Sequence, residues 1–133
     1  MRLLQCFKIL GAVLIVTVLA ACSGGKPEDT LDRFYRAAEK GDVDTAMKQM
    51  SFANVPAANM VQAKGKIQMI VGEAQNMIKA NGGYDSLEII ESKIAEDGKT
   101  ATVRAKLKFK NGKDKADNAR LAKEDDGWKI VLR

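Results

Sequence analysis

The hydrophobic pattern of this chain changes its period near Tyr84, from a helical repeat before this residue to an alternation after it. The alternation is strict between Ala101 and Lys110, where apolar residues at every second position are separated by threonine, arginine and lysine. A period of two is typical of a strand with one buried face. A chain whose helices all precede its strands is predicted to be an α+β domain, because the helices can then cover one face of a single sheet.

Three helices are predicted before residue 84. Pro27 suits the first position of a helix that runs to Lys40, and Gly41 suits its left-handed C-cap. Asp42 is expected to cap a short second helix that ends near Gln49. A third helix is expected over residues 60–80, where apolar residues recur at helical spacing until an Asn-Gly-Gly sequence stops it.

Four strands are predicted after the helices, over residues 87–95, 101–110, 114–123 and 128–132. The first has an irregular pattern that indicates a β-bulge. Asp-Gly and Asn-Gly sequences at 97–98 and 111–112 are typical of tight hairpin turns, and Asp126-Gly127 precedes the last strand. The expected fold is therefore three N-terminal helices packed on a curled, four-stranded antiparallel sheet.

The N-terminus has the features of an export signal. Arg2 and Lys8 are followed by an uncharged run, Ile9 to Ala21, which is shorter than the ~20 residues of a transmembrane helix. The run ends in Leu19-Ala20-Ala21-Cys22, which resembles the lipobox of bacterial lipoproteins. That resemblance implies cleavage before Cys22 and acylation of its sulfur; the alternatives are a plain signal peptide or an N-terminal membrane helix with a chance cysteine.

This interpretation divides the chain into a removed signal peptide (residues 1–21), a lipidated cysteine with a short tether (22–26) and one α+β domain (27–133). The expected location is the bacterial cell envelope, anchored by lipid. Lipoproteins with aspartate after the cysteine tend to stay in the inner membrane, and this chain has Ser23 there. The resemblance therefore implies the outer membrane, facing the periplasm, if the cell is Gram-negative. The four tether residues reach about 14 Å when extended, so the domain is held close to the membrane.

The composition excludes several kinds of chemistry. The chain contains no histidine, which rules out a Ser-His-Asp triad and histidine-ligated zinc or haem. Its two cysteines, Cys6 and Cys22, are assigned to the signal peptide and the lipid anchor, so no internal disulfide, metal site or cofactor is expected. Acidic pairs such as Asp125-Asp126 fall at turns or helix starts and lack the spacing of a calcium loop.

Two segments carry a resemblance that spans nearly all of the expected mature chain. Residues 34–46 read FYRAAEKGDVDTA, and residues 123–130 read KEDDGWKI. They resemble small bacterial lipoproteins with a cystatin-like, or nuclear transport factor 2-like, domain. The resemblance implies a cone between helices and sheet and leaves the reaction open. Enzymes of that superfamily use acidic or histidine residues inside the cone; histidine is missing here, and the sequence does not identify a cone acid.

Two surfaces are candidates for binding. The first is the cone, where aromatic and methionine side chains could surround a small apolar ligand or simply fill the core. Its candidate residues are Phe34, Tyr35, Met47, Met50, Met69, Phe109 and Trp128.

The second candidate is a basic sheet face, on which alternation places four cations of one strand, joined by one from each of the two following strands. These residues are Arg104, Lys106, Lys108, Lys110, Arg120 and Lys129. Such a face could meet anionic lipid head groups or an acidic envelope protein, or could be a solvated surface that discourages edge-to-edge aggregation. Nucleic acid is not an expected partner, because export separates the chain from it and no aromatic residue lies among the cations on their face to stack bases.

The leading functional prediction is a lipid-anchored, non-catalytic binding or accessory domain. A carrier of a small apolar ligand in the cone is the alternative, followed by an enzyme with a carboxylate there. No catalytic residue is assigned.

Overall fold

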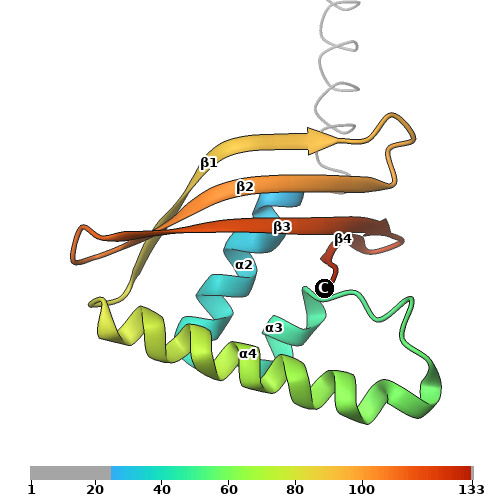
Figure 1. Ribbon diagram of the computed structural model, residues 1–133, viewed down its shortest axis with the longest axis horizontal. Coiled ribbons are helices and arrows are strands. Elements are labelled where there is room, and N and C mark those ends of the chain that lie inside the picture. Colours follow the sequence, from blue (N-terminus) through green and yellow to red (C-terminus); the bar gives the residue numbers. More distant parts are fainter. Residues whose placement is uncertain (1–24, 133) are drawn as a thin grey trace, which may run out of the picture.

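The computed structural model describes residues 25–132, and it has the predicted α+β architecture (Figure 1). The expected signal peptide and Cys22 lie outside the described residues. In the part of the chain that is described, no helix is both long and apolar enough to cross a bilayer. The elements in chain order are α2 (Pro27–Lys40), α3 (Val43–Lys48), the 3-10 helix η1 (Ala57–Asn59), α4 (Met60–Ala80), β1 (Tyr84–Ile94), β2 (Thr100–Phe109), β3 (Asp114–Glu124) and β4 (Gly127–Ile130).

The junction between α2 and α3 is built as the sequence predicts. Gly41 has a φ of 71° and ends α2, with its N–H donating to the carbonyl of Ala38 at 3.0 Å. A side chain here would also meet Gln75 of α4, whose Nε2 lies 2.8 Å from the position of a Cβ. Asp42 then caps α3 by accepting a hydrogen bond from the Thr45 N–H at 3.1 Å. The turn therefore holds α2 and α3 close to α4.

The sheet is an antiparallel meander in the order β1-β2-β3-β4. The register between β1 and β2 shifts between Ile89 and Glu91, which is the bulge that the irregular pattern indicates. β4 is short, and within the sheet it pairs with Leu121 to Glu124 of β3. The first half of β3 therefore has a strand neighbour on the β2 side alone.

The helices cover the inner face of the sheet, and α2 lies between the sheet and α4 (Figure 1). The buried residues form three clusters: one among the helices, one between α2 and the centre of the sheet, and one at the start of β1. Tyr35 of α2 packs against all three. Its side chain is therefore at the point where the parts of the core meet.

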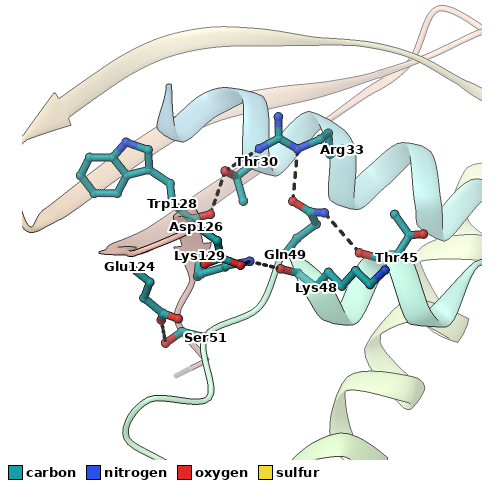
Figure 2. Close-up of polar contacts among 10 residues, drawn as sticks. All are labelled: Thr30, Arg33, Thr45, Lys48, Gln49, Ser51, Glu124, Asp126, Trp128 and Lys129. Atoms are coloured by element: carbon teal, nitrogen blue, oxygen red, sulfur yellow. Dashed lines mark hydrogen bonds and ion pairs between the residues drawn. The ribbon is translucent and has the colours of Figure 1, made fainter. Parts of the chain in front are cut away.

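The C-terminal strand closes the cone by binding back to the first helices (Figure 2). The buried Thr30 hydroxyl of α2 donates to the Trp128 carbonyl at 3.0 Å, and Arg33 joins Thr30 to Gln49. On the other side, Ser51 N–H donates to the carbonyl of Ile130 at 2.8 Å. These bonds fix β4 between α2 and the segment after α3.

Candidate ligand-binding site

A cavity of about 200 Å³ lies between α2, α4, β3 and the residues after β4. For comparison, an engineered apolar cavity of about 150 Å³ holds benzene, so this one has room for a somewhat larger molecule. Most of its lining is apolar and comes from elements far apart in the sequence. The lining residues are Leu31, Phe34, Tyr35, Met50, Ile70, Asp117, Asn118, Ala119, Arg120, Ile130, Val131 and Leu132.

Asp117 is the only acidic residue of this lining. It pairs with Ala105 of β2, whose side chain is buried, so strand alternation places Asp117 on the inner face of the sheet. The Tyr35 hydroxyl donates to its carboxylate Oδ2 at 2.6 Å. Both residues also line a second cavity of about 110 Å³ beside Met77 and Lys115. The Tyr35–Asp117 pair thus stands at a wall that the two cavities share.

The surroundings of Tyr35 keep its hydroxyl protonated. Burial raises the pKa of this hydroxyl far above its usual range, and the adjacent carboxylate of Asp117 raises it further through its charge and its hydrogen bond. The hydroxyl therefore acts as a hydrogen-bond donor at neutral pH and is a weak nucleophile.

A second tyrosine–aspartate pair lies nearby and differs in its charge balance. Tyr84 stacks on Tyr35 with ring centroids 6.1 Å apart, and its hydroxyl donates to Asp32 Oδ1 at 2.6 Å. The other oxygen of Asp32 accepts a hydrogen bond from the Arg36 guanidinium at 2.8 Å. Within residues 25–132, by contrast, no cation lies at ion-pair distance from Asp117. Asp117 is thus the carboxylate with charge left to compensate.

The structure brings together some of the residues predicted to line the cone. Phe34, Tyr35 and Met50 line the 200 Å³ cavity. Phe109 and Trp128 are buried in two of the packed clusters instead. Met47 borders a separate surface hollow next to Phe52 and Lys64.

Met69 does not belong to the cone, because 68% of its surface is exposed. The buried face of α4 is formed by Ile67, Val71, Ala74 and Ile78, and Met69 lies on the opposite side of that helix. An apolar residue in an amphipathic helix is thus not sufficient evidence for a pocket position.

The predicted basic face is partly neutralised by a neighbouring strand. Arg104 forms an ion pair with Glu91 of β1 at 3.4 Å, and Lys108 forms one with Glu88 at 3.5 Å. Lys106 and Arg120 share the outer face with them, since Arg120 pairs with Thr102 and Lys106 with Ala116. Lys110 lies past the end of β2, and its aliphatic chain lies beside Gly83.

Lys129 is not part of this face (Figure 2). Its ammonium group donates to the carbonyl of Lys48 at the end of α3 and forms an ion pair with Asp126 at 2.9 Å. It therefore helps to hold β4 against α3. The positive charge of the outer face is weaker than the sequence alone predicted, because β1 supplies acids that the bulge brings into register.

In the described part of the chain, no group of three or more histidine, cysteine, aspartate and glutamate residues is placed so that it could hold a metal ion. Asp117 is the residue that the sequence analysis missed. The sequence of β3, DKADNARLAKE, alternates poorly, so its buried face could not be recognised from periodicity. The available clue was the strict alternation of β2 across a short Asn-Gly hairpin, which sets the register of β3.

Comparison with known proteins gives a family and a fold neighbour. No match was found among curated proteins. The structure is similar to the crystal structure of a Campylobacter jejuni protein that is provisionally described as an NTF2-like transpeptidase, with a TM-score of 0.71 and 26% sequence identity. The similarity covers 80% of this chain and 98% of the Campylobacter chain, and it agrees with the helices on a curled four-stranded sheet. Residues 20–131 match the domain of unknown function DUF4878, and the chain belongs to that family.

Proposed function

We propose that this chain is a lipid-anchored protein of the bacterial cell envelope whose domain binds a small ligand in the cavity beside Asp117, without catalysis. The observation that carries the proposal is a carboxylate on an otherwise mostly apolar cavity with no cation at ion-pair distance among the described residues. The ligand that fits has an apolar body somewhat larger than benzene and a positively charged amine.

The chemistry of the cavity supports a cationic ligand. A partly buried carboxylate is unfavourable unless it is paired, and one hydrogen bond from Tyr35 satisfies only part of its capacity. An ammonium group would supply the missing charge and hydrogen bonds, while Phe34, Ile70 and Leu132 would contact the apolar body. Arg120 also belongs to the lining, but its register opposite Thr102 places it on the outer face.

The proposal of binding without catalysis is based on the residues of the lining. Transpeptidation requires a nucleophile, and among residues 25–132 no serine, threonine, cysteine or histidine lines the cavity. The Tyr35 hydroxyl is held protonated by burial and by Asp117, which raise its pKa. The activity in the description of the Campylobacter protein is therefore not part of the proposal.

Three small probes test the cavity: n-pentylamine, 1-pentanol and pentanoate. They have chains of the same length, and at neutral pH they are positive, neutral and negative. We expect pentylamine to raise the melting temperature of the protein and pentanoate to leave it unchanged, because only the amine complements Asp117. Asp117→Asn should abolish the preference for the amine. Asp114→Asn is the matched control, since Asp114 lies on the same strand opposite Lys108 of the outer face. Equal shifts with amine and carboxylate, or an unchanged preference in Asp117→Asn, would contradict the proposal.

The membrane anchor is tested separately from the cavity. Cys22→Ser should abolish labelling by radioactive palmitate and leave uncleaved precursor, because the sulfur that carries the lipid is removed. A variant that is still processed and still bound to membranes would refute the anchor. The outer membrane is the proposed location in a Gram-negative cell, and fractionation of the two membranes tests it.

Cations on the outer face of the sheet favour a second candidate, a docking surface for anionic head groups or an acidic envelope protein. Arg104, Lys106 and Lys108 project from one strand, and only the first and last have ion-pair partners on β1. Replacing all three by glutamine should weaken cosedimentation with vesicles that contain phosphatidylglycerol. Unchanged cosedimentation would exclude a head-group role, and an unchanged pull-down of envelope proteins would exclude a protein partner.

A further inference from the structure

The large apolar side chains that are exposed among residues 25–132 fall into two groups. Val61 and Met69 lie on α4, whereas Ile89, Ile90 and Ile94 lie within six residues of each other on β1. Ile90 and Ile94 are each about half exposed, and Ile89 is 38% exposed. We call these three isoleucines the β1 patch. It lies on a strand at the edge of the sheet, a place where proteins usually avoid exposed apolar side chains.

The β1 patch lies beside the point at which the domain joins its tether. The hydroxyl of Ser92, between Ile90 and Ile94, donates to Glu28 Oε2 in the first turn of α2 at 2.8 Å. Only five residues lie between Cys22 and Glu28, and such a segment spans about 20 Å at most. If Cys22 carries lipid, the β1 patch is held within a short distance of the bilayer surface.

The charges around the β1 patch nearly balance. Lys93 and Lys99 are close to it in the sequence, and so are Glu96 and Asp97 of the hairpin that follows β1. Glu91 is paired with Arg104. Attraction to anionic head groups is therefore weak here, and contact with a membrane would depend on burial of the isoleucines in the interfacial layer.

We infer that the β1 patch inserts into the interfacial layer of the membrane that carries the lipidated Cys22, so that the edge of β1 faces the bilayer. The inference depends on the proposed lipid anchor. Three isoleucines alone would bind a membrane weakly, but the tether keeps them at a high local concentration near the surface. The arrangement leaves α4 on the side of the domain away from the membrane, because α2 and the other strands of the sheet lie between α4 and the later part of β1 (Figure 1).

Depth-dependent quenching tests this orientation in the lipidated full-length product, reconstituted in phosphatidylcholine vesicles. Ile94→Cys and, separately, Ile90→Cys are labelled with an environment-sensitive fluorophore, and quenching by nitroxide-labelled lipids is measured. Met69→Cys and Val61→Cys are matched controls, because both replace exposed apolar residues on α4. All four positions are exposed, so labelling should preserve the fold, which the emission of the buried Trp128 can verify.

We expect several-fold stronger quenching at positions 90 and 94 than at positions 61 and 69, with little change when phosphatidylglycerol is added. Equal quenching at all four positions, in protein that still floats with the vesicles, overturns the orientation and leaves the anchor intact. Loss of flotation overturns the anchor and the inference together. Quenching at positions 90 and 94 that appears only with phosphatidylglycerol overturns the apolar mechanism.

Discussion

Tyr35 and Tyr84 stack on each other in the core, and each donates a hydrogen bond of 2.6 Å to an aspartate. Their surroundings differ in one respect. Asp32, the partner of Tyr84, is also bound by Arg36, whose guanidinium lies 5.3 Å from the centre of the Tyr84 ring. Asp117, the partner of Tyr35, borders two cavities and has no such cation among residues 25–132.

The two pairs show how similar contacts can have different consequences. An aspartate that already has its cation is part of the structure and has little to offer a ligand. An aspartate with the same hydrogen bond but without a cation has charge that a ligand can complement. This difference is the reason for proposing a ligand at Asp117 and a structural role for Asp32.

Replacing each tyrosine by phenylalanine gives the largest expected effect. Tyr35→Phe should lower the free energy of unfolding by about 2 kcal/mol, because it removes the hydrogen bond that the partly buried Asp117 carboxylate accepts from Tyr35. Tyr84→Phe should lower it by about 1 kcal/mol, because Arg36 still binds Asp32. Urea unfolding followed by the fluorescence of Trp128, the single tryptophan, measures both. If the two variants lost equal amounts of unfolding free energy, Arg36 would not account for a difference between the Tyr84–Asp32 and Tyr35–Asp117 pairs.

The hydrogen bond from Tyr35 to Asp117 should also make the stability of the protein depend on pH in the alkaline range. Burial and Asp117 raise the pKa of Tyr35, so the folded protein holds the hydroxyl proton more tightly than the unfolded chain. The protonated Tyr35 hydroxyl stabilises the folded state fully below pH ~10, which is the pKa of a tyrosine in an unfolded chain. This stabilisation is lost as the pH rises above that value. The difference in unfolding free energy between wild type and Tyr35→Phe should narrow by about 1 kcal/mol at pH 11. A constant difference from pH 8 to 11 would contradict this prediction.

Arg36→Gln is expected to have the smallest effect on the free energy of unfolding. It leaves Asp32 without its cation, so the Tyr84–Asp32 pair then resembles the Tyr35–Asp117 pair. The Arg36–Asp32 pair joins neighbouring turns of α2, and the Arg36 side chain is 55% exposed, so its removal should cost only about 0.5 kcal/mol. In the Arg36→Gln background, however, Tyr84→Phe should become more destabilising than in the wild type. A double-mutant cycle measures this coupling, and strict additivity would show that the arginine does not support Asp32.

Much of the fold could be predicted because local signals and the global pattern agree. Pro27, Lys40 and Gly41 mark the ends of α2 as the structure has them. The strand ends were less accurate, since β1 begins at Tyr84 rather than Leu87 and β4 ends at Ile130 rather than Leu132. Tyr84 joins β1 by pairing with Phe109, which is a long-range contact that a short sequence window does not contain.

The candidate site was harder to predict, because it depends on which strands meet. Glu88 and Glu91 neutralise cations on the neighbouring strand, and a bulge whose position could not be inferred brings them into register. Asp117 resembles the surface residues on either side of it in the sequence. Its position on the cavity follows from the pairing with β2 and from the shortness of β4, and both are properties of the assembled sheet.

The hydrogen bond from Thr30 to the Trp128 carbonyl joins residues that are 98 positions apart. Its consequence is kinetic. Synthesis from the N-terminus produces α2 first, yet α2 cannot complete its buried contacts until the final strand has also been made. Closing so long a loop is slow compared with forming a helix. We therefore expect the domain to depend on protection against aggregation during this interval, although its native state is held by a compact core.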